Sequence, residues 1–234
     1  YLALAVSFAF AIFIILIPDN SNQVHFINKK LSPLTRSIGV ESSPNLSSKG
    51  DYLVFQKNSP QHDLHEWWIK GVENDFPAQR LSIHNQRSPI SWSHHRDAFL
   101  YVEWQGTCSV NEMSVQDGSL AVNKVLDCGD NWISQLAYAK DENGFYYIAR
   151  KLVHEPWKVY FYDLQAQSSV AINQPQTTGF GNYAFDLSPQ KDKLLILSSV
   201  NDNSTALYQL DIKSNELSHQ GSRDWVLNKA IWHH

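Results

Sequence analysis

The chain has 234 residues, of which 43% are hydrophobic, 12% aromatic and 18% charged. This composition excludes an intrinsically disordered chain, and 10 glycines and 9 prolines exclude a collagen-like fibre. The net charge is −4 and no basic run is longer than Lys29-Lys30, so we expect no nucleic acid to be contacted by these residues, because phosphate binding needs a basic patch. The length allows one large all-β domain.

The first 17 residues, Tyr1 to Ile17, are apolar and carry no charge. We predict a transmembrane helix over residues 1–18, with its N-terminal flank missing because the chain starts with Tyr. The alternative is the apolar region of a signal peptide, but such a region is usually shorter and precedes a small-residue cleavage site. No Lys or Arg occurs from Pro18 to Ile27, which favours a location outside the cytoplasm for the residues that follow.

A sequence repeat runs through the rest of the chain. Each copy has an apolar residue that ends one strand, a polar turn of about five residues, and an aromatic or β-branched run that begins the next strand. The copies cover residues 46–55, 92–101, 138–147 and 187–196. Their matched Asp or Asn residues, at positions 51, 97, 143 and 192, are 46, 46 and 49 residues apart.

A second hairpin follows the first in every copy. Its first strands are expected at 66–69, 110–115, 159–162 and 206–210, and turns such as Asp117-Gly118 close the hairpins. Four strands that recur about every 45 residues, with no amphipathic helix between them, are typical of a β-propeller blade. The sequence therefore predicts an all-β fold, a β-propeller of four-stranded blades over residues 19–234.

The two ends of this region are predicted to be parts of further blades. Residues 24–27 and 31–35 fit the last two strands of a blade, and residues 230–232 fit a first strand. We therefore expect a partial propeller with about four complete blades, clipped at its C-terminus.

One repeat carries a family signature. Residues 43–55, SPNLSSKGDYLVF, resemble the Pro-x-x-Ser-x-Asp-Gly-x-x-Leu-x-Phe pattern of the TolB-like (WD40-like) propeller repeat, and Ser188-Pro189 repeats its Ser-Pro. The resemblance covers about residues 24–234 and implies the fold rather than a function. The second copy departs from it at His94-His95-Arg96, and the third has Ala139 in place of the serine. These departures fall on turn positions and weaken the repeat match.

The order of the segments resembles a second family. A propeller behind a single span is similar to the periplasmic part of CadC/ToxR-type transmembrane transcriptional regulators. This resemblance implies a non-enzymatic sensor in the periplasm, anchored once in the bacterial inner membrane, whose winged-helix DNA-binding domain is missing from this chain. It would bind a protein partner or a small ligand at a propeller face. In the span, Ala5 with Ala9 and Ser7 with Ala11 offer a weak homodimer motif.

The alternative belongs to a different functional class. The chain also fits the substrate-gating propeller of a membrane-anchored serine peptidase of the dipeptidyl-peptidase type. A Gly-x-Ser-x-Gly nucleophile elbow would identify that class, and no such motif occurs in these residues. The sequence therefore favours a binding role over an enzyme.

Two cysteines flank the second hairpin of the second copy. Cys108 and Cys128 are equally far from Gly118 in the turn, so a symmetric hairpin places them nearly opposite each other. Facing Cβ atoms lie about 4.5 to 5.5 Å apart, and strand twist can shorten this to the ~3.8 Å of a disulfide. In an oxidising compartment we expect a bond that stabilises the fold by about 3 kcal/mol. The alternative is two separate small buried residues.

Few other residues form a pattern that carries chemistry, so we expect no catalytic residue, no cofactor and no metal. His62 and His65 lie in an acidic run before a strand, but a metal needs three or four converging ligands, and a solvated loop is the simpler interpretation. Trp104 and Trp157 occupy matched positions between the two hairpins of their copies. With the two histidines they are candidates for a rim surface that takes a ligand or partner, whereas most other tryptophans are assigned to the core.

Overall fold

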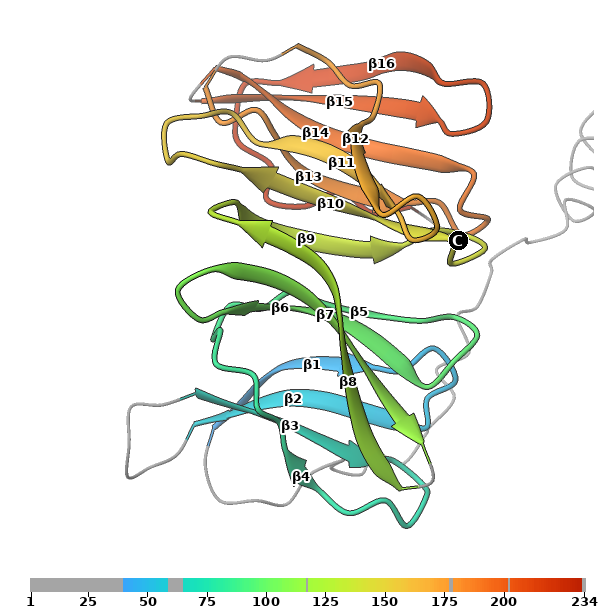
Figure 1. Cartoon of the computed structure of the whole chain (residues 1–234). Coiled ribbons are helices and arrows are strands. Elements are labelled where there is room, and N and C mark those ends of the chain that lie inside the picture. The colour runs from blue at the N-terminus through green and yellow to red at the C-terminus, as the bar shows by residue number, and fades with distance from the viewer. Residues whose placement is uncertain (1–39, 59–64, 117, 177–178, 202, 233–234) are drawn as a thin grey trace, which may run out of the picture. The chain divides into compact units, whose positions relative to one another are not determined.

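The computed structural model describes residues 40–58, 65–116, 118–176, 179–201 and 203–232. These residues form sixteen strands in four consecutive four-stranded antiparallel sheets (Figure 1). The first two sheets contain β1 (Glu41–Leu46), β2 (Tyr52–Asn58), β3 (His65–Gly71), β4 (Gln79–Arg80), β5 (Ile90–Trp92), β6 (Ala98–Trp104), β7 (Cys108–Gln116) and β8 (Ser119–Gly129). The last two contain β9 (Trp132–Tyr138), β10 (Gly144–Arg150), β11 (Lys158–Asp163), β12 (Ser168–Ala171), β13 (Asn182–Leu187), β14 (Lys193–Asn201), β15 (Ser204–Asp211) and β16 (Glu216–Arg223).

Every sheet is an up-and-down meander in which spatial order follows chain order. The four predicted first hairpins are confirmed, and they share one register. In each, the apolar residue that ends the first strand pairs with the residue seven positions later: Leu46 with Leu53, Trp92 with Phe99, Tyr138 with Phe145, and Leu187 with Leu194. The repeat in the sequence is therefore a repeat of strand register.

Serine side chains hold the first-hairpin turns in three of the four sheets. Ser47 Oγ accepts the N–H of Tyr52 at 3.0 Å, and Ser93 Oγ accepts that of Arg96 at 2.8 Å. Ser188 Oγ accepts the N–H of Lys193 at 3.1 Å. A serine hydroxyl that bonds to nearby backbone stabilises a tight turn, which explains why the residue type recurs at this position.

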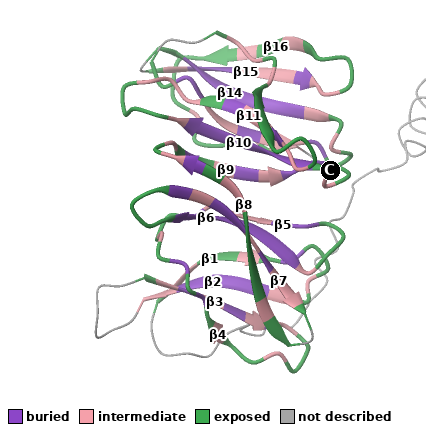
Figure 2. Cartoon of the chain, viewed as in Figure 1, coloured by how far each residue is buried: buried purple, intermediate pink, exposed green. Residues whose placement is uncertain are grey.

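The core consists of three apolar layers, one between each pair of consecutive sheets. The central strands supply two layers at once, because their side chains alternate between two faces that are both apolar. In β6, Phe99 and Tyr101 pack in the layer shared with the first sheet. Leu100 and Val102 pack in the layer shared with the third sheet. Figure 2 shows these central strands as buried and the outer strand β8 as largely exposed.

The predicted strand at residues 230–232 is wrong, because the structure leaves these residues outside any strand. A strand needs a partner to form a ladder, and none of the described strands pairs with this segment. Its tryptophan nevertheless repeats a contact of the second sheet. Trp232 Nε1 donates to the carbonyl of Asp186 at 3.3 Å, as Trp92 Nε1 donates to that of Asn45 at 3.2 Å.

Three predictions lie outside the described residues: the transmembrane helix over 1–18 and the two strands at 24–27 and 31–35. Among the residues that the structure does describe, no helix is long and apolar enough to cross a membrane.

Candidate functional site

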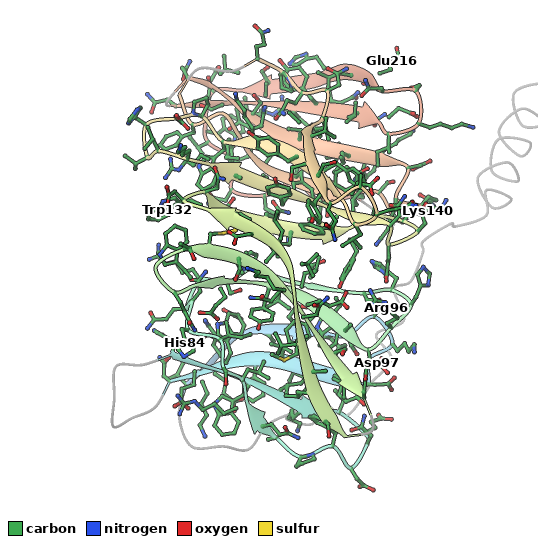
Figure 3. All side chains as sticks on the ribbon, viewed as in Figure 1. His84, Arg96, Asp97, Trp132, Lys140 and Glu216 are labelled. Carbon is green, nitrogen blue, oxygen red and sulfur yellow. A yellow bond between two sulfur atoms is a disulfide. The ribbon has the colours of Figure 1, made fainter. Side chains whose placement is uncertain are left out.

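The strand ends form two faces of the described unit. His84 and Trp132 lie on one of them, which we call the loop face because it carries the connections between hairpins and between sheets (Figure 3). Arg96, Asp97 and Lys140 lie on the opposite one, which we call the turn face because it carries the turns of the first hairpins (Figure 3). The two faces differ in how their polar groups are used.

A pocket of about 750 Å³ opens on the loop face. It is formed by the connection from β4 to β5 together with strand ends of the second and third sheets. Its lining consists of His84, Asn85, Gln86, Arg87, Val102, Trp104, Trp132, Ile133, Ser134, Arg150 and Trp157. Among these described residues two are arginines and none is Asp or Glu, so the lining is cationic in a chain whose net charge is −4. We call it the loop-face pocket.

Two exposed indoles form one wall of the loop-face pocket. Trp104 ends β6 and Trp132 begins β9, and their ring centroids are 5.8 Å apart with the planes inclined by 45°. The side chains are 37% and 58% exposed. Large aromatic rings that remain in water beside a pocket are typical of a surface that takes a ligand or partner.

A disulfide fixes the strand ends that carry these two indoles. Cys108 and Cys128 are bonded and buried, with their Cα atoms 5.0 Å apart. Cys108 pairs with Trp104 across β6 and β7. On the other side, the N–H of Asn131 donates to the carbonyl of Cys128 at 3.0 Å, immediately before Trp132. The covalent link therefore lies at the base of both tryptophans.

The hairpin register at the disulfide differs from the symmetric expectation. Cys108 is opposite Gly129, and the next pair is Ser109 with Asp127. Cys128 is thus the extra residue of a β-bulge, which turns its side chain toward the neighbouring strand.

A cation stacked on a third indole lies beside Trp132, because Arg150 and Trp132 are register partners in β10 and β9. The guanidinium of Arg150, the last residue of β10, lies 4.3 Å from the ring centroid of Trp157. Its Nη1 donates to the carbonyl of Val153 at 2.7 Å. Its Nε is buried and has no hydrogen-bond partner among the described residues. A buried donor on a charged group that has no partner within the chain is costly.

Gly181 holds Trp157 in place. The N–H of Trp157 donates to the carbonyl of Phe180 at 2.9 Å, and its own carbonyl accepts the N–H of Asn182 at 2.8 Å. Gly181, between these two partners, has a φ of +79°, and a Cβ on it would collide with the Trp157 backbone. Only glycine combines this conformation with so close an approach.

His84 and Ser134 line the same pocket without forming a nucleophile and its base. Both carboxylate oxygens of Glu103 accept the backbone N–H of His84, at 3.2 and 3.1 Å. The imidazole Nδ1 lies 2.9 Å from Gln105 Nε2. Within the described part of the chain no hydrogen bond joins His84 to Ser134, and an activated serine needs a base within that reach.

The structure brings together only some of the residues proposed from the sequence. Trp104 and Trp157 line the loop-face pocket. His65 is exposed at the start of β3 and lines a separate pocket of about 300 Å³, and His62 lies outside the described residues. The described ranges contain no group of three or more His, Cys, Asp or Glu side chains placed to hold a metal ion.

Sequence reasoning missed Trp132 and Arg150. Two other tryptophans, Trp67 and Trp92, are buried as expected for a core assignment, but Trp132 is not. The sequence did contain a signal for both residues. Trp132 and Arg150 lie at strand ends, and the predicted order of strands places these ends on the same side of the sheets as Trp104.

On the turn face, a polar network joins the second and third sheets. Arg96 donates from Nη1 and Nη2 to the two oxygens of Glu112, both at 2.9 Å, and from Nη2 to Glu142 at 3.3 Å. Tyr138 donates its hydroxyl to Glu112 at 2.7 Å, and the N–H of His94 donates to Glu142 at 2.6 Å. Every named group here has a partner from another strand or sheet.

Protonation in this network follows from burial and pairing. Burial raises the pKa of the Glu112 carboxyl, but hydrogen bonds from Arg96 and Tyr138 outweigh it and leave that pKa below its usual value. The pKa of Glu142 is lowered in the same way, because bonds from Ser93 and the His94 backbone outweigh burial. Both carboxyls therefore stay ionised at neutral pH.

Lys191 extends the network to the fourth sheet. Its Nζ donates to the carbonyl of Tyr138 at 3.2 Å. Burial lowers the pKa of Lys191 to about 8, although the nearby charge of Glu142 opposes the shift. The first sheet joins through Ser48, whose Oγ donates to the carbonyl of Ser93 at 2.7 Å. The turn face thus holds all four sheets together.

Comparison with known proteins addresses the fold. No protein-family profile and no curated protein sequence matches the chain. TolB from Acinetobacter baumannii superposes with a TM-score of 0.60 at 13% identity, over 80% of this chain and 44% of that one. The chain has a TolB-like β-propeller fold. Its sixteen strands are thus four propeller blades, as the repeat predicted.

Propellers of peptidases have the same fold. A puromycin-hydrolysing peptidase from Mycobacterium tuberculosis matches with a TM-score of 0.61 at 13% identity, over 85% of this chain and 31% of that one. Dipeptidyl peptidase 4 from Porphyromonas gingivalis matches with a TM-score of 0.54 at 14% identity, over 85% and 35%. The chain spans less than half the length of each of these structures. At this identity the similarity extends to the propeller fold alone.

Proposed function

We propose that this propeller is a non-catalytic binding module that recognises a ligand or partner at its loop face. The observation that carries the proposal is the loop-face pocket, which is lined by exposed Trp104 and Trp132 and by the guanidinium of Arg150, one of whose donors has no partner among the described residues. Contact with a bound ligand would stabilise both the exposed rings and the Arg150 donor that has no partner among the described residues.

We further propose that the module works outside the cytoplasm, as the periplasmic sensor of a single-span regulator of the bacterial inner membrane with a winged-helix DNA-binding domain. Support comes from the apolar stretch Tyr1 to Ile17 and from the absence of Lys and Arg directly after it. The disulfide adds support, because such bonds persist in oxidising compartments.

Catalysis is tested directly with a matched variant. The purified full chain is treated with a fluorophosphonate probe, which reacts only with activated serines. We expect no labelling above that of Ser134→Ala, because no hydrogen bond joins Ser134 to a base among the described residues. Labelling that disappears in Ser134→Ala would overturn the non-catalytic proposal.

The location outside the cytoplasm is tested with two fusions at the C-terminus. Alkaline phosphatase folds only in an oxidising compartment, whereas green fluorescent protein exported through the general secretory route stays dark. We expect an active phosphatase fusion and a dark fluorescent fusion. The opposite pattern would place the propeller in the cytoplasm and exclude the periplasmic role.

The second candidate is the substrate-gating propeller of a membrane-anchored serine peptidase. It is favoured by the fold matches, which cover only 31% and 35% of two peptidase chains. In that case the loop face would meet a hydrolase domain rather than a free ligand. Hydrolysis of a dipeptide nitroanilide by the full-length protein would support this candidate, and its absence would favour the sensor.

A further inference from the structure

We propose that the loop-face pocket binds a small carboxylic acid whose neighbouring group is flat and apolar. Arg150 receives the carboxylate, the indoles of Trp104 and Trp132 receive the flat group, and Trp157 positions Arg150. The proposal deepens the proposed function and rests on it, because it names the class of ligand that the binding module would recognise.

The donors of Arg150 match a carboxylate. Nη1 is used by the carbonyl of Val153, whereas the edge formed by Nε and Nη2 makes no hydrogen bond to any described residue. These two N–H groups are parallel, and a carboxylate accepts from both at once. A neutral carbonyl would satisfy only one of them and would not compensate the charge.

The guanidinium is also held in one orientation before a ligand arrives. Stacking on Trp157 at 4.3 Å and the bond to Val153 fix its plane. Trp157 itself is fixed by backbone bonds to Phe180 and Asn182 around Gly181. A prepositioned arginine loses little side-chain entropy on binding, so more of the interaction energy contributes to affinity.

The charge around the pocket favours an anion. Arg87 lines it together with Arg150, and the described lining contains no carboxylate. Two acids are close to lining residues in the sequence, and each accepts a backbone N–H group. Glu103 accepts that of His84, and its Oε1 lies 3.3 Å from the imidazole Nδ1 of the same residue. Glu155 accepts the N–H of Leu152 at 3.3 Å.

The aromatic wall decides what accompanies the carboxylate. Trp104 and Trp132 present inclined rings to solvent, and such surfaces stack best on flat or apolar groups. The pocket volume of about 750 Å³ is within the range of small-molecule sites and exceeds that of one amino acid. A free aromatic acid and the last residue of a peptide share this chemistry.

The test compares two ligands that differ only in charge. Calorimetric titration of the full chain uses N-acetylphenylalanine and its amide. We expect the acid to bind at least about tenfold more tightly, because the amide cannot accept two bonds from Arg150. Equal affinities, or no binding of the acid, would overturn the inference without requiring any variant.

Matched variants assign the preference to individual residues. Arg150→Gln should reduce the affinity for the acid to that for the amide, whereas Arg223→Gln, at an exposed arginine outside the pocket, should not. Trp132→Ala should weaken both ligands about tenfold. Trp225→Ala, at another indole that is 58% exposed, should weaken neither. If a pocket variant and its control changed the affinity equally, the pocket residue would not be responsible for binding.

Two further measurements use a conservative variant and a longer ligand. Arg150→Lys keeps the charge but not the paired donors, so it should lose most of the preference while its thermal unfolding stays near that of the wild type. Acetyl-Ala-Ala-Phe distinguishes the sources: tighter binding than acetylphenylalanine indicates a peptide end, and equal binding indicates a free acid.

A dipeptide nitroanilide is incubated with the same samples. Its hydrolysis would refute the proposed function whatever the binding result. Equal binding of acid and amide without hydrolysis would refute this inference alone.

Discussion

Two arginines on opposite faces of the described unit, one in the second sheet and one in the third, are used in opposite ways. Arg96, on the turn face, bonds to the carboxylates of Glu112 and Glu142 and joins two blades. Arg150, on the loop face, donates to one carbonyl, stacks on one indole and has a buried donor without a partner among the described residues. The charge of Arg96 is neutralised by carboxylates of the same chain and stabilises the fold. The charge of Arg150 has no carboxylate partner among the described residues, so we expect it to be available to a ligand.

The same contrast separates the aromatic residues. Trp92 is buried between the first and second sheets and donates to a backbone carbonyl of the first. Trp132 occupies the other end of a first strand and is 58% exposed. In these two first strands, therefore, the indole at the turn end packs between blades, whereas the indole at the loop end is exposed to solvent.

The largest expected effect concerns the disulfide at the loop face. Replacing both cysteines, with Cys108→Ser and Cys128→Ser, should lower the free energy of unfolding by about 3 kcal/mol, because a loop of 20 residues is no longer closed. Urea unfolding measures this change. The wild type with its disulfide reduced should lose a similar amount, and a variant as stable as the oxidised wild type would contradict the prediction.

Two glycines with positive φ offer a direct comparison of the faces. Gly181→Ala should cost about 2 kcal/mol, because the new Cβ adds a collision with Trp157 to the strain of the backbone. Gly50→Ala, on the turn face with open space around it, should cost about 1 kcal/mol. Thermal unfolding measures both. Only Gly181→Ala should weaken ligand binding at the loop face, and equal binding by the two variants would separate Trp157 from the site.

Arg96→Gln tests the turn-face network through its pH dependence. We expect a loss of about 1 kcal/mol at pH 7, because Glu112 and Glu142 lose their shared partner. The folded pKa values of both carboxyls are lowered, so their contribution is present above the unfolded value of about 4.3 and is lost as the pH falls through the folded values. The gap between variant and wild type should therefore close in acid. A gap that is constant from pH 7 to pH 3 would exclude this electrostatic origin.

The smallest effect concerns Lys191. Its folded pKa is about 8, below the unfolded value of about 10.4, so between these values the unfolded chain binds more protons than the folded chain. A shift of this size in a fully buried group would raise the stability by about 3 kcal/mol across that window, and solvent screening of the partly exposed Lys191 lowers the expected rise to roughly 1 kcal/mol. Lys191→Met should lack this rise, whereas Lys140→Met, at an exposed lysine of the same face, should show it. Identical pH profiles for the two variants would contradict the prediction.

Much of the blade structure was predictable because its causes are local. Alternating apolar residues and a serine or glycine turn define each first hairpin within about ten residues, and all four register pairs agree with the repeat. The hairpin that carries Cys108 and Cys128 was identified for the same reason. Residues 230–232 show the limit of this reasoning, because their apolar pattern is local but a strand also needs a partner.

The sequence by itself determined the four-stranded repeat, the fold class and two members of the candidate site, Trp104 and Trp157. Only the tertiary structure decided that Trp132 and Arg150 join them, because packing of the second sheet on the third brings together strand ends that are far apart in the chain. The tertiary structure also decided which arginine donors are paired. The sequence does not distinguish Arg96 from Arg150. In the folded chain Arg96 is paired with Glu112, whereas Nε of Arg150 has no partner among the described residues.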